Sequence, residues 1–266
     1  MRDNFLSNLK LVVVKVGTST LSSKSQPMDK HAVRKISKQV CELLDKGIKV
    51  VLVSSGAIGA GMHLLGLKAR PKTLNHLQAA AAIGQAQLMK AYDEYFKDHG
   101  RKVAQVLLTR DDLEERKRYV SVKSTILTIL EYGAVPIINE NDTVSVDEIK
   151  FGDNDTLASL VTTLLGADLL IILSDVDGLY SHMGKKKVID TVREIDSGIE
   201  KRACGTDKET CVGGMLTKIR AAKVVTDSGI PMVIANGKTE GILIKIVNKE
   251  KVGTIFAPGS KRASCK

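Results

Sequence analysis

The chain has 266 residues, 43% hydrophobic and 26% charged, a balance that is typical of a globular protein with a buried core. Aromatic residues make up 3% and Trp is absent, which argues against the aromatic stacking surfaces that bind single-stranded nucleic acid. The formal net charge is +10, but Lys and Arg alternate with Asp and Glu along the chain. This favours a solvated basic surface, which also attracts anionic small molecules, over a nucleic-acid-binding face.

The cysteines lack the spacings of a zinc site or a disulfide framework. The sequence contains four of them, and none forms a CxxC pair or a pattern with His: Cys41, Cys204, Cys211 and Cys265. No apolar run reaches the ~18 residues of a membrane span, and the N-terminus lacks a signal-type apolar region. We therefore expect a cytoplasmic protein without membrane contact.

Short aliphatic runs alternate with helical patterns along the chain. Continuous apolar blocks predict parallel strands that are covered on both faces, and three-to-four spacing of apolar residues predicts the helices between them. This alternation predicts a single-domain α/β/α sandwich with a mainly parallel central sheet. Residues 143–152 predict a small hairpin, and 178–212 a hairpin and a mobile flap. The predicted strands are 10–16, 49–54, 103–108, 135–139, 168–173 and 231–235, and the predicted helices 29–46, 75–98, 154–165 and 216–228.

Two turns near the N-terminus follow strand-like runs and contain small residues. The first is Lys15-Val16-Gly17-Thr18, and the second runs from Ser54 to Gly61 with glycines at 56, 59 and 61. A strand, a small-residue turn and a helix together present backbone N–H groups to a bound anion. Lys15 can neutralise a phosphate, although a lysine at a strand end can also simply reach solvent. The glycines fit close packing of helix and strand as well as anion binding, and their spacing is not GxGxxG.

Two clusters of Asn and Asp flank the predicted hairpin. They are Asn139-Glu140-Asn141-Asp142 and Gly152-Asp153-Asn154-Asp155, so both can return to one place. Carboxylates suit an ammonium group and amides suit a carboxylate, so this pattern indicates a zwitterionic ligand. A calcium loop would need a bidentate Glu at a fixed spacing, which the sequence lacks.

Two further segments suit a nucleotide. Ser174 and Asp175 follow the fifth predicted strand, where Asp177-Gly178 also fits a plain turn. Gly213-Gly214 opens the helix that carries Lys218, and free N–H groups at such a helix start bind anions.

In this order the motifs resemble the amino acid kinase family, over residues 9 to 257. Within it, Asn139-Glu140-Asn141-Asp142 followed by Gly152-Asp153-Asn154-Asp155 is characteristic of the members that phosphorylate glutamate. The other matching strings are Val14-Lys15-Val16-Gly17-Thr18-Ser19, Ser54-Ser55-Gly56-Ala57-Ile58, Gln105-Val106-Leu107-Leu108-Thr109 and Gly213-Gly214-Met215.

The resemblance implies ATP-dependent phosphorylation of the γ-carboxylate of L-glutamate, the first step of proline synthesis, with Mg²⁺ held mainly through ATP phosphates. It implies three groups of site residues. The catalytic set is Lys15, Lys218 and Asp155, with Asp155 orienting both lysines. The glutamate set is Ser55, Gly56, Ala57, Asp142 and Asn154, and the ATP set is Lys15, Gly17, Ser174, Asp175, Val212, Gly213, Gly214, Met215 and Lys218.

The chain departs from the family pattern at one loop. Members usually carry Gly-Thr before Gly-Gly-Met, whereas this chain has Cys211-Val212, which removes a hydroxyl and predicts weaker ATP binding. We expect a kinase domain over 1–257, a tail over 258–266 and no PUA domain. The resemblance also implies a homodimer or homotetramer and transient contact with a glutamyl phosphate reductase.

Three alternatives remain open from the sequence. The chain could phosphorylate another small acid, of the aspartate, carbamate or UMP type. It could be a weakly catalytic sensor of glutamate or proline, which Cys211-Val212 would favour. It could also bind nucleic acid, which would show as a steep salt dependence of affinity.

Overall fold

The computed structural model describes residues 2–23, 27–144, 154–182, 185–204 and 214–259. Within them an eight-stranded sheet has the order β3-β4-β2-β1-β5-β9-β10-β8. Neighbouring strands are parallel except β9 and β10. The strands of this sheet are β1 (Leu11–Val16), β2 (Lys49–Ser54), β3 (Lys102–Leu108), β4 (Ala134–Glu140), β5 (Leu169–Ser174), β8 (Thr191–Val192), β9 (Met232–Asn236) and β10 (Thr254–Phe256).

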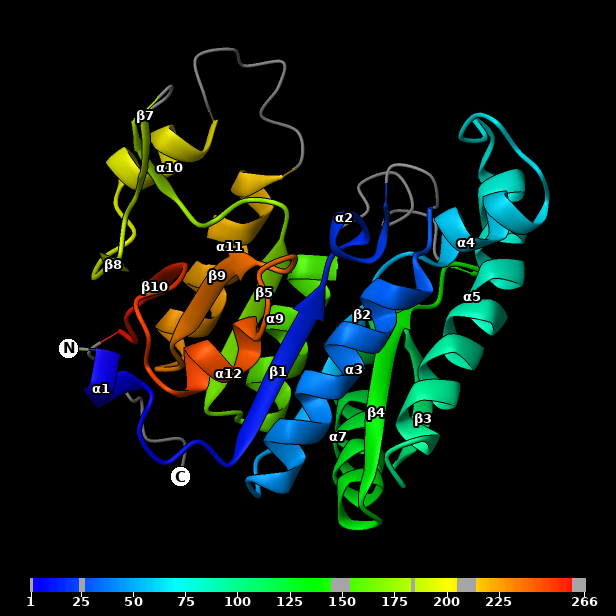
Figure 1. Cartoon of the computed structure of the whole chain (residues 1–266), viewed down its shortest axis with the longest axis horizontal. Coiled ribbons are helices and arrows are strands. Elements are labelled where there is room, and N and C mark those ends of the chain that lie inside the picture. The colour runs from blue at the N-terminus through cyan, green and yellow to red at the C-terminus, as the bar shows by residue number, and fades with distance from the viewer. Residues whose placement is uncertain (1, 24–26, 145–153, 183–184, 205–213, 260–266) are drawn as a thin grey trace.

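Helices cover both faces of this sheet (Figure 1). Along β1, Val12 and Val14 pack into one apolar cluster and Val13 into the other, as the alternation of a strand requires. The predicted α/β/α sandwich with a mainly parallel sheet is therefore confirmed. The first cluster includes side chains of α3 (Lys30–Asp45), α5 (Leu74–Lys97) and α12 (Ile242–Val247), and the second those of α7 (Arg116–Glu131), α9 (Asn154–Leu165) and α11 (Met215–Asp227).

Shorter elements surround the sandwich. A two-stranded antiparallel sheet pairs β6 (Tyr180–His182) with β7 (Lys185–Val188), where the sequence predicts a hairpin. No helix within the described ranges is long and apolar enough to cross a bilayer. The remaining helices are α1 (Arg2–Phe5), α2 (Thr18–Leu21), α4 (Ala57–Leu64), α6 (Arg110–Glu114) and α10 (Ser197–Cys204).

The six predicted strands and four predicted helices all form, with bounds within one residue of the expected ones. The sequence did not predict the helices α1, α6, α7, α10 and α12, nor the short strands β8 and β10. Nearly all of the predicted hairpin over 143–152 lies outside the described residues, as does 205–213 within the predicted flap.

The central position of β1 sets the location of the site. The chain places β2 on one side of β1 and β5 on the other, so the strand order changes direction there. In doubly wound sheets, ligands bind at such a point, beyond the carboxyl ends of the strands. In Figure 1 the arrowhead of β1 points toward α2, with α4 beyond it, and a ligand site is expected at this edge of the sheet.

Candidate functional site

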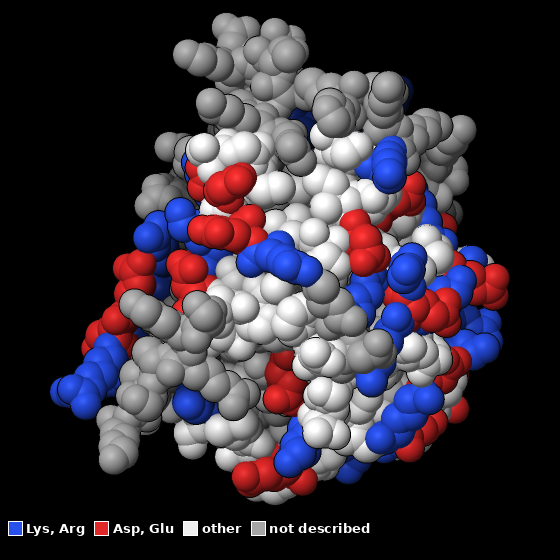
Figure 2. All heavy atoms as spheres, turned by 90° about the vertical axis from the view of Figure 1, so that its left-hand side faces the viewer, with Lys and Arg blue, Asp and Glu red and all other residues white. Residues whose placement is uncertain are grey.

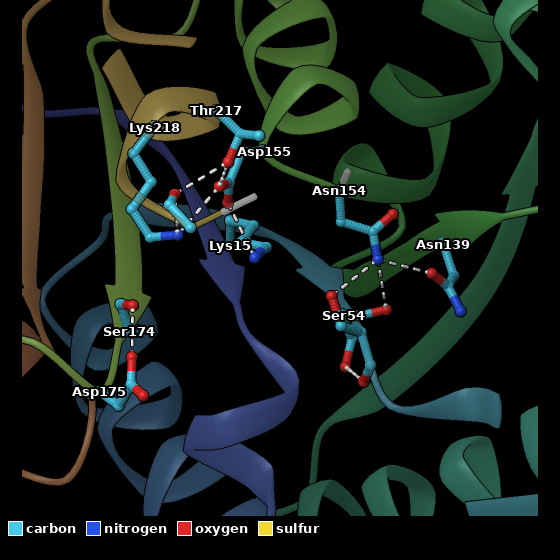
Figure 3. A network of polar contacts seen from close by, with 11 residues as sticks. Lys15, Ser54, Asn139, Asn154, Asp155, Ser174, Asp175, Thr217 and Lys218 are labelled. Atoms are coloured by element: carbon cyan, nitrogen blue, oxygen red, sulfur yellow. Dashed lines mark hydrogen bonds and ion pairs between the residues drawn. The ribbon is translucent and has the colours of Figure 1, made fainter. Parts of the chain in front are cut away.

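Two lysines distant in sequence meet on one carboxylate at this edge (Figure 3). Lys15 Nζ lies 2.8 Å from Oδ1 of Asp155, and Lys218 Nζ lies 3.1 Å from its Oδ2. Thr217 Oγ1 donates a hydrogen bond of 2.7 Å to the same Oδ2. The side chains of Lys15, Asp155 and Lys218 are all less than 10% exposed. The cluster thus holds two cations and one anion, and its net positive charge favours an anionic ligand.

The fold explains why these three side chains converge. On β1, Lys15 shares the face of Val13, so its side chain points toward the helices α9 and α11. Asp155 is the second residue of α9, where the helix dipole stabilises a carboxylate. Lys218 lies in the first turn of α11, where the dipole disfavours a cation. Its ammonium is held instead by Asp155 and by the Gly214 carbonyl at 3.0 Å.

The ionisation of Asp155 depends on these lysines. Burial raises the pKa of this carboxyl, but the charges of Lys15 and Lys218, together with hydrogen bonds from Lys15 and Thr217, outweigh burial and lower the pKa overall. Asp155 is therefore ionised at neutral pH and fixes the positions of both ammonium groups.

A pocket opens beside this cluster, at the carboxyl ends of β1 and β5. The absence of a side chain at Gly17 leaves space in this pocket. A Cβ at Gly17 would lie 3.1 Å from the Leu173 carbonyl oxygen and 3.5 Å from Lys15 Nζ. Ser174 Oγ donates to Asp175 Oδ1 at 3.1 Å. The lining residues are Lys15, Gly17, Thr18, Ser19, Ser55, Asp155, Ser174, Asp175, Val176, Gly214, Met215, Thr217 and Lys218, and we call this the nucleotide pocket.

A second pocket lies beyond the carboxyl ends of β2 and β4. Gly56 enters α4 with a φ of +109°, a left-handed conformation that glycine adopts without strain. Acidic and amide side chains face this pocket together with one guanidinium, that of Arg70. Its lining residues are Thr18, Ser55, Gly56, Ala57, Ile58, Gly59, Met62, Arg70, Asn139, Glu140, Asp142 and Asn154, and we call it the acceptor pocket.

The two pockets are neighbours, because Thr18 and Ser55 line both. A ligand in each would therefore meet near these hydroxyl groups, with the buried lysines on the nucleotide side. This arrangement suits transfer of a group between two bound molecules.

A chain of amides orients the acceptor pocket. Asn154 Nδ2 donates to Ser55 Oγ and to Asn139 Oδ1, both at 2.9 Å. Asn139 Nδ2 donates in turn to Gln85 Oε1 at 2.9 Å, and Gln85 is buried on α5. Because Asn154 uses its NH₂ group inside the protein, its carbonyl oxygen is the atom left to accept from a ligand.

A buried tyrosine supports the strand end beneath this chain. Tyr92 OH lies 2.9 Å from Ser54 Oγ, and burial, partly offset by this hydrogen bond, raises the pKa of Tyr92 to about 12. The phenol thus stays protonated and gives Ser54 a permanent partner.

The structure places every predicted site residue that it describes in one of these two pockets. Val212 and Gly213 lie outside the described residues, as do Cys211 and Asp153. Of the predicted catalytic residues, Lys15 and Lys218 both form ion pairs with the third, Asp155. The predicted glutamate residues all line the acceptor pocket: Ser55, Gly56, Ala57, Asp142 and Asn154.

Several polar residues of the site escaped the sequence analysis. Thr217 directly precedes Lys218 in the first turn of the predicted helix, and this position indicates that its hydroxyl group can also face the site. Gln85 lies within an Ala-rich helix, and Arg70 lies in a loop with other cations, so neither stood out. The acceptor pocket is also lined by three residues that belong to the motifs described above, Thr18, Asn139 and Glu140.

The glycines of the second turn serve helix packing as well as the pocket. A Cβ at Gly61 would lie 1.8 Å from the Ala80 carbonyl oxygen, and one at Gly84 would lie 1.8 Å from that of Ala57. Gly61 therefore allows close contact between α4 and α5. The sequence also predicts close packing of helix and strand as an alternative role for these glycines. Gly61 does have a packing role, but its partner is a helix, α5, and not a strand.

The charges on one face of the protein are mixed. Figure 2 shows Lys and Arg side chains beside Asp and Glu over the visible surface, without a continuous basic area among the described residues. Within the same residues, no group of three or more His, Cys, Asp or Glu side chains could hold a metal ion.

A family model and individual related proteins both assign this chain to the same family. The sequence model of the amino acid kinase family matches residues 10–236. Glutamate 5-kinase of Clostridium acetobutylicum is 48% identical over 264 residues, which are 98% of this chain and 99% of that protein. Glutamate 5-kinase of Alkaliphilus metalliredigens is 44% identical over 97% of this chain and 100% of its own length, and that of Geobacter sulfurreducens is 44% identical over 98% and 71%. The chain belongs to the amino acid kinase family.

Proposed function

We propose that the protein transfers the γ-phosphoryl group of ATP to the γ-carboxylate of L-glutamate, giving L-glutamyl 5-phosphate and ADP. This reaction begins proline synthesis. The observation that carries the proposal is the shared wall of the two pockets, Thr18 and Ser55, next to the buried lysine pair. Relatives that match nearly the whole chain are glutamate 5-kinases, which supports glutamate as the acceptor.

The chemistry needs positive charge more than it needs a base. The γ-carboxylate of glutamate is ionised at neutral pH, so no proton has to be removed before it attacks. One carboxylate oxygen bonds to the γ-phosphorus while the bond from that phosphorus to the β–γ bridging oxygen breaks, and ADP leaves. The obstacle is the approach of two anions, which the ammonium groups of Lys15 and Lys218 offset.

Asp155 acts on the reaction through the lysines. Its two oxygens hold the two ammonium groups at 2.8 and 3.1 Å, so both charges are in place before substrates bind. Preorganised charges cost no reorganisation during the reaction, which is why they stabilise the transition state strongly. Lys15, Lys218 and Asp155 are therefore the proposed catalytic set.

The remaining residues bind the two substrates. Gly17, Ser174, Asp175, Gly214 and Met215 line the nucleotide pocket and would hold ATP. Val212 and Gly213, which precede Gly214 in the sequence, are proposed to contribute to the same site. In the acceptor pocket, Asp142 would attract the ammonium of glutamate. The carbonyl oxygen of Asn154 would accept from the same group.

Mg²⁺ would arrive on the ATP phosphates and neutralise part of their charge, as in other phosphoryl transfers. We also propose a homodimer or homotetramer, and transient transfer of the labile acyl phosphate to a glutamyl phosphate reductase. Size-exclusion chromatography with light scattering tests the assembly.

The decisive experiment is ADP release with ATP and Mg²⁺, measured in parallel with glutamate, aspartate, carbamate and UMP. Hydroxylamine in the same assay traps an acyl phosphate as a coloured hydroxamate. The proposal requires ADP and hydroxamate to form in equal amounts with glutamate. Release with aspartate or UMP instead would overturn the acceptor, and glutamate binding without any ADP release would favour a sensor.

A further inference from the structure

The acceptor pocket contains one cation among its described lining residues. That cation is Arg70, and it shares the pocket with two acidic side chains, Glu140 and Asp142. Lys15 and Lys218 line the other pocket, and Arg70 is not among the described lining residues of that one. The charge of Arg70 is thus directed at the acceptor rather than at the nucleotide.

The charges of the proposed acceptor match this set. Glutamate has a γ-carboxylate, an ammonium group and an α-carboxylate. The γ-carboxylate has to face the shared wall at Thr18 and Ser55, because the phosphoryl group arrives there. The ammonium group pairs with the acidic side, at Asp142 and Glu140. The α-carboxylate is then the one charged group of glutamate without an assigned partner. Arg70 is the one charged side chain of the described pocket lining that has not been assigned to a ligand group.

A guanidinium is suited to this remaining group. Its planar donors match the two oxygens of a carboxylate in a bidentate pair, which a lysine ammonium does not. Arg70 makes no ion pair with any described residue, so a ligand does not have to displace a partner. Its side chain is exposed, which lets it reach a ligand after that ligand has entered.

The loop that carries Arg70 is anchored at both ends. It connects α4 to α5, and these helices touch closely at Gly61 and Gly84, where no Cβ would fit. At the start of α5, Thr73 Oγ1 is hydrogen-bonded to His76 Nδ1. The loop is thus held over the acceptor pocket, although its middle lies at the surface.

We propose that Arg70 binds the α-carboxylate of the acceptor and is a specificity-determining residue of this pocket. The inference rests on the proposed function for the identity of the acceptor. It predicts that the pocket selects molecules with a carboxylate at the α position and rejects analogues in which that group is neutral.

The test pairs a protein change with a ligand change. Arg70→Gln removes the guanidinium charge, and L-isoglutamine replaces the α-carboxylate by an amide while keeping the ammonium group and the γ-carboxylate. For glutamate, Arg70→Gln should raise KM about 10- to 100-fold, the range for one charge-assisted hydrogen-bonded pair, with kcat within about twofold. For isoglutamine, measured as its Ki against glutamate phosphorylation, the same variant should differ from wild type by less than about threefold. Arg70→Lys should fall between wild type and Arg70→Gln.

Two neighbouring cations provide matched controls. Lys68 and Lys72 are exposed on the same loop and are not among the described lining residues of the pocket. Lys68→Gln and Lys72→Gln change the local charge equally and should leave KM for glutamate within about twofold. Equal losses in all three variants would overturn the inference, since they would show a diffuse field rather than a contact.

Other results would also decide against it. An unchanged KM for glutamate in Arg70→Gln, or equal weakening of glutamate and isoglutamine, excludes a contact with the α-carboxylate. The wild-type assay separates this inference from the proposed function. If wild type releases no ADP with glutamate, the function fails, and calorimetric Kd values of both ligands with wild type and Arg70→Gln still decide the role of Arg70.

Discussion

Asn154 and Asp155 are consecutive residues at the start of α9, yet they line different pockets. Asn154 faces the acceptor pocket through the amide chain, and Asp155 faces the nucleotide pocket through the lysine pair. Successive residues in a helix point about 100° apart, so one helix start can serve two ligands. The first turn of α9 therefore spans the junction at which the proposed transfer takes place.

Removal of either buried lysine should slow the reaction. We expect Lys15→Ala and Lys218→Ala to lower kcat by about 10²–10³, the range for one preorganised charge-stabilising donor. Steady-state rates at saturating ATP and glutamate measure this. Lys223→Ala is the control, because Lys223 is on the same helix as Lys218 but its side chain is 57% exposed. A wild-type kcat in Lys15→Ala would remove that residue from the mechanism.

Loss of the Asp155 carboxylate should destabilise the fold in a pH-dependent way. Asp155→Asn leaves two buried ammonium groups without a counter-charge, and we expect a loss of about 3–5 kcal/mol in unfolding free energy at pH 7. The pKa of Asp155 is lowered in the folded protein from its ordinary value of 3.8. Its stabilising contribution is therefore complete above about pH 5 and is lost as the pH falls through the folded pKa.

Urea unfolding of wild type and Asp155→Asn between about pH 3 and pH 7 measures this dependence. The difference between the two proteins should be constant above about pH 5 and should shrink below about pH 4. Glu114→Gln is the control, since its pair with Arg110 is exposed and should contribute less than about 1 kcal/mol. A difference that grows on acidification would contradict the assignment.

The sequence predicted the core of the fold well, because the central strands are continuous aliphatic runs. It did not predict α7, although Tyr119, Val122, Ile126 and Leu130 recur there at the three-to-four spacing of a helix and pack against the second apolar cluster. The strands β8 and β10 have two and three residues, too few for a periodic signal. Such elements form because neighbouring strands supply their partners.

Some residues of the site could be predicted from the sequence and others could not. Lys15 and Asp155 belong to motifs next to strong strand and helix signals, so their positions at the sheet edge could be predicted. Gln85 and Arg70 contribute through tertiary contacts alone, from a helix interior and a loop. Contacts of this kind produce no local sequence pattern. The hydrogen bonds between the amides, and the combination of Arg70 with acidic side chains in the acceptor pocket, could therefore be recognised only in the structure.

Gln85 should affect glutamate binding without touching it. Gln85→Leu removes the acceptor of Asn139 Nδ2, so the amide chain loses its fixed direction. We expect KM for glutamate to rise about 5- to 20-fold, with KM for ATP within about twofold. Gln85→Glu keeps an acceptor and should recover most of the loss. Gln39→Leu is the control, since Gln39 is equally buried but bonds to Leu243 of α12. If Gln39→Leu raised KM for glutamate as strongly, general destabilisation would explain both.

Close packing of α4 against α5 should make Gly61 intolerant of any side chain. A Cβ there would lie 1.8 Å from the backbone oxygen of Ala80, so Gly61→Ala forces the helices apart and should cost about 1–3 kcal/mol or more in unfolding free energy. Gly59→Ala is the matched control on the same helix, because its Cβ would lie 3.4 Å from the Pro27 side chain. Alanine favours a helix over glycine, so Gly59→Ala should change stability by less than about 1 kcal/mol. Urea midpoints of both variants measure the difference. Equal midpoints would mean that α4 and α5 are not in contact as described, and the anchoring of the loop that carries Arg70 would fail with them.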